Sequence, residues 1–243
     1  MAFTAQDVKA LREKTGVGMM ECKKALVEAD GDMDKAVDFL RERGLAAAAK
    51  KATRIAAEGV VLPYYDAEAK KGVVVEVNSE TDFVAKNEKF MSFVEGVAKT
   101  ILATNPADVE ALKEEKFDGT DRTVTETLND LVLSIGENMK VRRFERMDGI
   151  VSTYIHGGGS VGVMVGFDVA DESKAATAEF DAMGKNVAMQ IAAMSPAYLD
   201  EASVPAEVVE HEKTILAAQM KEDPKMASKP EAVLAKIAAG KMG

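Results

Sequence analysis

The sequence contains no tryptophan and only one cysteine, Cys22, among its 243 residues. A single cysteine excludes an internal disulfide framework and a multi-cysteine zinc site, and it is typical of a reducing compartment. No stretch approaches the roughly 18 apolar residues of a membrane span. The first residues also lack the apolar core of a secretory signal. We therefore expect a cytoplasmic protein.

Positive charge is scarce as well. The chain has 31 lysines and arginines against 41 aspartates and glutamates, a formal net charge of -10. A negative field repels nucleic acids and anionic membrane surfaces, so neither is expected to bind, and a protein is the expected partner. The sequence has no GxxxxGK[ST] motif and no GxGxxG motif after a predicted strand. We expect no direct nucleotide binding, no cofactor and no metal site.

What is present predicts a globular protein, since 47% of the residues are hydrophobic and 30% are charged. Three helical patterns run from Thr4 to Gly44. Thr4 and Asp7 form a predicted capping box, and Gly44 is expected to end the third helix. An alanine-rich segment, "AAAAKKATRIAAE", follows as a predicted connector helix. Residues 1–55 are thus predicted to form a helical module and its connector.

The middle of the chain contains an internal repeat. Two β-branched runs between Gly59 and Asn78 predict a hairpin, and an amphipathic helix follows through Leu102. A shift of 90 positions reproduces this unit without a gap. The recurring residues include Gly59, Tyr64, Phe90 and Ile101, which return as Gly149, Tyr154, Phe180 and Ile191.

These patterns predict an α+β fold with four parts. After the module come two related hairpin-plus-helix subdomains, residues 56–147 and 148–194. The first also holds a helix near residues 125–135 and a strand in "NMKVRRFER". Residues 195–243 are expected to form an antiparallel, coiled-coil helical arm with a proline-bearing turn in "DPKMASKP".

One aromatic residue, Phe83, stands among polar residues in "NSETDFVAKNEKF". Thr81 can cap a helix here, and Phe83, Phe90 and Val97 lie near one helical stripe, which favours a core role. The internal repeat opposes this, because the equivalent of Phe83 is Ser173. A core role and a partner-binding role therefore stay equally open.

Two motifs resemble catalytic or metal-binding signatures. Gly158-x-Ser160-x-Gly162 matches the nucleophile elbow of serine hydrolases, and "HGGG" from His156 matches an oxyanion loop. An elbow needs a strand, a turn and a helix, whereas Ser160 is predicted to lie between paired strands. The aspartates at Asp30, Asp32 and Asp34 begin like a calcium loop, but Lys35 replaces its essential glycine. We expect no catalytic residue.

Two longer stretches resemble a known family. "LREKTGVGMMECKKAL", Leu11 to Leu26, and "EVNSETDFVAKN", Glu76 to Asn87, are similar to the two signatures of bacterial elongation factor Ts. The resemblance extends in order along essentially the whole chain. It implies a ubiquitin-associated-like N-terminal module, a two-part α/β core and a coiled-coil arm. It also implies a guanine nucleotide exchange factor that releases GDP from elongation factor Tu during protein biosynthesis.

The resemblance further implies which residues meet that partner. Asp82 and Phe83, with Thr81 before them, would enter the G domain of elongation factor Tu beside its magnesium and phosphate site. The N-terminal module would dock on the same domain through Arg12, Met19, Met20 and Lys23. The hairpin of the second subdomain would approach the third domain of the partner with His156. From the residues alone, the two methionines could equally be core filler, and His156 an ordinary solvated side chain.

Family members continue beyond the arm, whereas this sequence ends at "AAGKMG". We therefore expect the subdomain at 148–194 to be incompletely covered. Two rival functions remain: a serine hydrolase that uses Ser160, and a ubiquitin-associated-like adaptor whose partner is not a GTPase.

Overall fold

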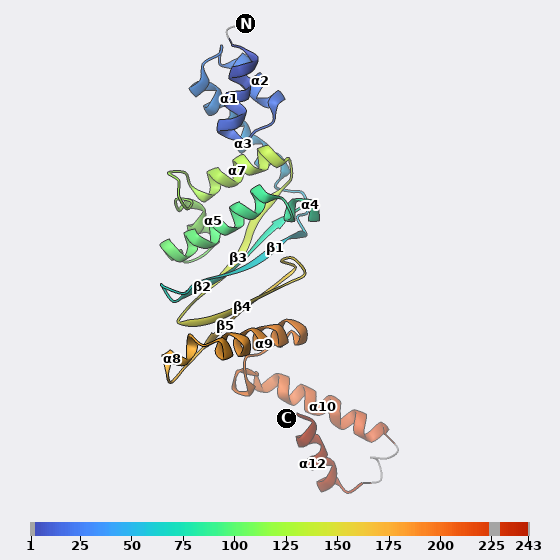
Figure 1. Ribbon diagram of the computed structural model, residues 1–243. Helices are drawn as coiled ribbons and strands as arrows, with labels where there is room; N and C mark the ends of the chain where they lie inside the picture. Colours follow the sequence, from blue (N-terminus) through green and yellow to red (C-terminus); the bar gives the residue numbers. More distant parts are fainter. Residues whose placement is uncertain (1–2, 224–228, 243) are drawn as a thin grey trace. The chain divides into compact units, whose positions relative to one another are not determined.

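The computed structural model describes residues 3–223 and 229–242 (Figure 1). The chain forms two compact units, Met1–Met194 and Ser195–Gly243. Helices and antiparallel strands are both present, so the predicted α+β class is confirmed. The finer division of the first unit near residues 55 and 147 stays a prediction. No helix within the described residues combines the length and hydrophobicity that a bilayer crossing requires.

Three helices open the first unit: α1 (Ala5–Thr15), α2 (Met19–Glu28) and α3 (Met33–Lys51). The predicted capping box at the start of α1 is confirmed, since Thr4 and Asp7 bond reciprocally. The three helices share a small core. It contains Val8, Leu11, Val17, Cys22, Ala25, Leu26, Ala36 and Leu40. Burial raises the pKa of the Cys22 thiol, as expected for a cysteine that fills space.

The prediction that Gly44 ends the third helix is wrong. Helix α3 continues through Gly44 to Lys51 and includes only the first part, Ala46 to Lys51, of the segment that was predicted as a separate connector. Gly44 is buried, and a Cβ atom there would lie 3.4 Å from the main-chain oxygen of Asn129. This distance is an ordinary contact, so Gly44 simply lies where α3 packs against helix α7 (Val124–Ile135), which carries Asn129.

The central sheet has the order β1-β2-β3, and every pair is antiparallel. Its strands are β1 (Glu58–Asp66), β2 (Lys71–Ser79) and β3 (Met139–Asp148). Val73, Val75 and Val77 of β2 are fully buried in the main core, against α5 (Glu88–Thr104). Glu76 is also buried, and its carboxylate accepts bonds from Arg142 Nη1 at 2.8 Å and Arg143 Nε at 2.7 Å.

Two short helices complete this half, α4 (Asp82–Ala85) and α6 (Val109–Glu114). Both α5 and α7 lie on the face of the central sheet that points toward the N-terminal helices (Figure 1). The stacked rings of Phe93 and Phe117, 5.5 Å apart, extend the core along α5.

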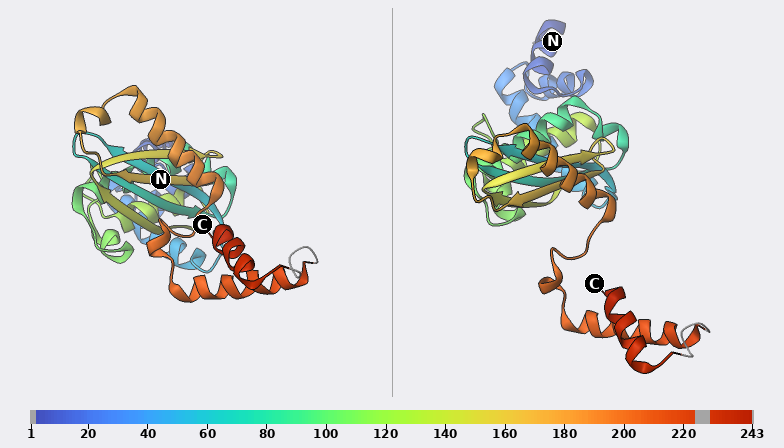
Figure 2. Two further views of the ribbon diagram at one scale, coloured as in Figure 1. Left: turned by 90° about the horizontal axis from the view of Figure 1, so that it is seen from below. Right: turned by 60° about the horizontal axis from the view of Figure 1, so that its bottom comes forward.

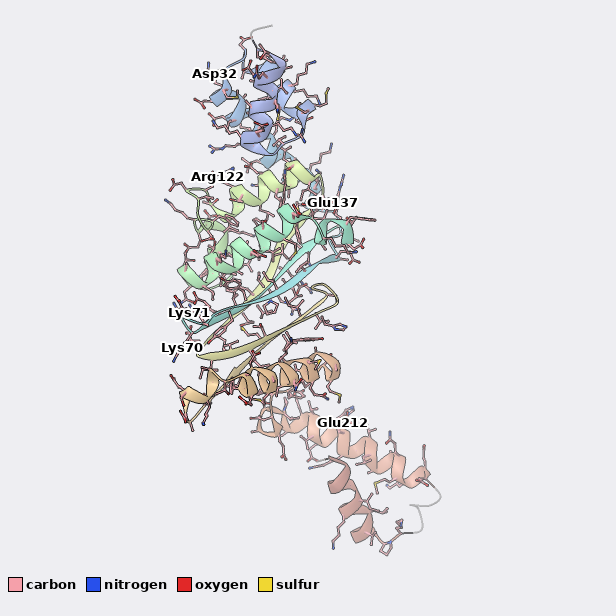
Figure 3. The ribbon with its side chains drawn as sticks, viewed as in Figure 1. Asp32, Lys70, Lys71, Arg122, Glu137 and Glu212 are labelled. Carbon is pink, nitrogen blue, oxygen red and sulfur yellow. The ribbon has the colours of Figure 1, made fainter. Side chains whose placement is uncertain are left out.

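A second, two-stranded sheet pairs β4 (Ile150–His156) with β5 (Val161–Phe167). It contacts β1 and β2 on one side and helix α9 (Ala178–Met194) on the other. Figure 2 shows α9 running across these strands, so helices and two sheets stack as successive layers. The short helix α8 (Glu172–Ala175) precedes α9, and Glu172 pairs at 2.7 Å with Lys70 of the β1–β2 turn. Lys70 is labelled in Figure 3.

A hairpin followed by a long helix thus occurs twice, as the repeat predicts, and in both halves a short helix that was not predicted stands between them. Helices α4 and α8 are themselves 90 residues apart, and Ser173 of α8 stands where α4 has Phe83.

The second unit contains a 3-10 turn, η1 (Glu201–Ser203), and the helices α10 (Ala206–Glu222) and α12 (Glu231–Met242). The two long helices contact each other. The proline-bearing turn predicted between them falls largely on residues 224–228, which lie outside the described residues.

Candidate functional site

The ring of Phe83 is 80% exposed, although its neighbour Val84 is buried in the main core. The core interpretation of Phe83 is therefore wrong. Its physical basis fails because Phe83 does not share a helix with Phe90. Asn87 begins a new helix, since its Oδ1 accepts a bond from Lys89 N at 2.9 Å. Phe83 belongs instead to the single turn α4, which presents the ring to solvent.

Asp82, the first residue of α4, forms an exposed ion pair with Lys86. Lys86 Nζ lies 2.8 Å from Asp82 Oδ2. The hydrogen bond and the positive charge of Lys86 lower the pKa of the Asp82 carboxyl below its ordinary value. The site at neutral pH therefore presents an apolar ring directly beside a carboxylate, with a lysine one turn later.

Thr81 does not cap α4 with its side chain, so that prediction is wrong. Its hydroxyl donates instead to Glu137 Oε1 at 2.8 Å, and its main-chain N–H donates to Glu137 Oε2 at 3.0 Å. Glu137 lies between α7 and β3, beside α4 (Figure 3). The adjacent residues form a bond in which donor and acceptor segments are exchanged: Asn138 N donates to Glu80 Oε1 at 2.5 Å. We call these four residues, Glu80, Thr81, Glu137 and Asn138, the cross-clamp.

The N-terminal module exposes a second apolar feature. Met19 is 44% exposed and Met20 is 66% exposed at the start of α2. The alternative that these methionines fill the core is wrong. Both line a shallow pocket of about 320 Å³, together with Phe3, Val8 and Lys23. Arg12 is exposed on α1 and does not line this pocket.

A lysine joins the module to the core. Lys89, on the first turn of α5, donates from Nζ to the Gly16 carbonyl oxygen at 3.0 Å, and Ser134 Oγ donates to the same oxygen at 2.9 Å. Gly16 ends α1 with a left-handed backbone, φ 68°. A Cβ atom at Gly16 would lie only 3.1 Å from Lys89 Nζ, so a glycine suits both the turn and the contact. Gly16, in the first signature stretch, is thus held to the first turn of α5, which begins just after the second stretch ends at Asn87.

His156 ends β4 and is exposed next to the β4–β5 turn. Its Nδ1 lies 3.1 Å from the hydroxyl of Tyr154. The carbonyl of Gly159, in that turn, accepts a bond from Val61 N at 2.8 Å. Val61 lies near the start of β1, whose first residue pairs with the end of β2 just before α4. The turn and α4 therefore lie at the same end of the central sheet (Figure 1).

The nucleophile elbow is excluded by this geometry. Ser160 lies in a hairpin turn and is followed by β5, not by a helix. Its Oγ donates to the main-chain carbonyl of His156 at 3.2 Å, so the imidazole is not its partner. The acidic segment fails as a calcium loop for a local reason: Asp32 Oδ1 caps α3 by accepting from the main-chain N–H of Asp34 and Lys35. Within the described residues no cluster of three potential ligands could hold a metal ion.

Glu80, Glu137 and Lys89 are the site residues that were not predicted. Glu137 is 56 residues from Thr81 and Lys89 is 73 residues from Gly16, so no local pattern marks either contact. The sequence feature that comes closest to marking these residues is their position beside the ends of predicted helices and strands.

Comparison with known proteins identifies a family and several relatives of this chain. Residues 80–243 match the family model described as elongation factor TS. The elongation factor Ts of Clostridium perfringens strain SM101 is 51% identical over 243 residues, which covers 99% of this chain and 77% of the relative. That of Syntrophotalea carbinolica is 50% identical over 245 residues, with 100% and 78% covered. That of Clostridium novyi is 47% identical over 243 residues, with 98% and 77% covered.

The exposed segment at Phe83 begins inside the stretch that the family model matches, and the relatives cover nearly the whole chain at about half identity. The chain therefore belongs to the elongation factor Ts family of translation elongation factors.

Proposed function

We propose that the chain is a guanine nucleotide exchange factor of the cytoplasm that binds elongation factor Tu and promotes GDP release. It acts by disturbing the magnesium-phosphate site of the partner, and it performs no covalent chemistry. The observation that carries the proposal is the exposed ring of Phe83 beside the Asp82 carboxylate, on a turn whose start is fastened by hydrogen bonds to Glu137 and Asn138.

A free protein gains nothing from an aromatic ring in water, because burial of such a ring is worth about 1.5 to 3 kcal/mol. An exposed ring on a fixed turn is suited to insertion into a partner pocket. The Asp82 carboxylate would arrive with it. A negative charge near a bound phosphate and its cation weakens their attraction, which is the direction that GDP release requires.

The mechanism is mutual exclusion. If the exchange factor weakens GDP binding by some factor, GDP weakens binding of the exchange factor by the same factor. Each tenfold change in affinity requires about 1.4 kcal/mol of coupling free energy. Phe83 alone therefore accounts for roughly one or two factors of ten. The remainder must come from other contacts, for which Arg12, Met19, Met20 and Lys23 of the module and His156 of the hairpin are the candidates.

The test measures release of labelled GDP from elongation factor Tu with and without this chain. We expect faster release, and we expect excess GDP to detach the chain from immobilised elongation factor Tu. An adaptor with a different partner would give neither result. Binding that excess GDP leaves unchanged would contradict mutual exclusion, even if the two proteins associate.

A further inference from the structure

The cross-clamp fastens the turn that carries Phe83 at one point, Thr81. The carboxylate of Glu137 accepts two hydrogen bonds from this one residue, at 3.0 Å from its main-chain nitrogen and 2.8 Å from its hydroxyl. A bidentate contact of this kind fixes both the position and the orientation of Thr81. The adjacent bond from Asn138 N to Glu80 prevents rotation of the two chain segments about the first contact.

Helix α4 needs such external support. It has four residues, which is a single turn, and a helix of this length is not stable by itself in water. Thr81 provides no side-chain cap, and Val84 is the buried residue of the turn. The Asp82–Lys86 ion pair spans the turn, and Ser79 Oγ donates to the Thr81 carbonyl at 3.0 Å. The supports that come from outside this segment are the buried side chain of Val84 behind the ring and the bonds from Thr81 to Glu137 in front of it.

Glu137 has no evident role in the core. It is half-buried beyond the end of α7, after the helix has already ended at Gly136. Across the described residues, no lysine, arginine or histidine forms an ion pair with its carboxylate at 4.0 Å or less. The two donors of Thr81 are what holds this charged group in place.

We propose that Glu137 is a positioning residue for exchange: it acts through Thr81 to hold Phe83 in the orientation that enters the partner. This inference rests on the proposed function. Because Glu137 acts through Phe83, its removal slows GDP release by no more than removal of the ring itself. Loss of one well-formed contact to a charged group corresponds to roughly tenfold slower release.

The experiment compares Glu137→Ala with Glu137→Gln and with Glu126→Ala. Glu126 is the matched control. Its Oε2 accepts from Thr123 N at 2.9 Å and so caps the start of α7, whereas Glu137 lies just beyond the end of that helix. Glutamine retains an acceptor for the Thr81 N–H and can donate to the Thr81 hydroxyl. We expect Glu137→Ala to slow GDP release roughly tenfold, and the other two variants to stay within about threefold of the parent.

A second comparison separates positioning from a general loss of stability. In a Phe83→Ala background, Glu137→Ala should change the exchange rate by less than about twofold, because no ring is left to orient. Urea unfolding should show similar losses for Glu137→Ala and Glu126→Ala. Should Glu137→Ala fail to fold, Thr81→Val removes the hydroxyl bond from the other side, and the same comparison with the Phe83→Ala background applies.

Two outcomes would overturn this inference alone: an unchanged exchange rate in Glu137→Ala, or an equal further loss when Phe83 is already alanine. In both cases a slow Phe83→Ala variant would still support the proposed function. An unchanged rate in Phe83→Ala would instead remove the anchor from the proposed function, and the positioning role with it.

Discussion

Replacement of Phe83 by alanine should separate stability from activity. With 80% of the residue exposed, about one fifth of its surface is buried in the free protein. Complete burial of the ring is worth about 1.5 to 3 kcal/mol, so truncation should lower the free energy of unfolding by about 0.3 to 0.6 kcal/mol. Phe90, seven positions later, is 0% exposed. Phe90→Ala should cost about 3 to 5 kcal/mol and serves as the matched control.

In the exchange assay Phe83→Ala should be the more damaging of the two variants, although it is the less damaging to stability. If Phe83 is buried by the partner, Phe83→Ala loses most of that 1.5 to 3 kcal/mol, which corresponds to roughly 10- to 150-fold slower GDP release. The assay is stopped-flow release of a fluorescent GDP from elongation factor Tu at subsaturating exchange factor. Urea unfolding of both variants, followed by circular dichroism, gives the stability values.

Two results would refute this reasoning. A loss of more than about 2 kcal/mol in the unfolding of Phe83→Ala would mean that the ring packs against its own fold. A parental exchange rate in a stably folded Phe83→Ala would mean that the ring does not act in exchange.

Three further predictions concern other parts of the chain. Gly96→Ala should lower the free energy of unfolding in urea by about 1 to 3 kcal/mol, because a Cβ atom there would lie 2.1 Å from the Phe117 ring. Unchanged stability would contradict this packing. Burial raises the pKa of Glu76, but hydrogen bonds from two arginines and an asparagine outweigh it, so the folded-state pKa lies below the ordinary 4.5. Its contribution is present above that value and is lost as the pH falls below it through the folded-state pKa, so Glu76→Gln should flatten the decline of stability that urea unfolding shows below about pH 4.5. Lys89→Met should release one of the two bonds to the Gly16 carbonyl and speed amide hydrogen exchange around residues 16–18, whereas parental protection there would show that the bond is dispensable.

Local patterns predicted the elements well where local chemistry decides them. The capping box at Thr4 and the hairpin of the second half depend on neighbouring residues, and both were recognised. The prediction for Gly44 was wrong because glycine is a frequent helix end, whereas this glycine lies inside α3, where the helix packs against α7. Asn87 was missed as the start of α5, which placed Phe83 on the wrong helix.

The candidate site was predictable in its exposed residues and not in its supports. Phe83 and Met20 stand in long signature stretches, which the sequence displays directly. The fastening of Thr81 by Glu137 depends on how α7 and β3 bring a distant loop beside α4. Contacts across 56 residues leave no periodic signal, so sequence reasoning assigned Thr81 a local capping role that the fold does not give it.

The exposed ring also bears on how the free protein behaves at high concentration. An exposed aromatic ring favours nonspecific association with other apolar surfaces, including those of another copy of the chain. Here charged residues flank it in the sequence, with Glu80, Asp82, Lys86 and Glu88 within five positions of it. A nonspecific contact at the ring would desolvate these charges, which costs free energy. The net charge of -10 also makes copies of the chain repel one another. The charged residues that flank the ring thereby favour contact with a partner surface that can satisfy them over chance contact with another apolar surface.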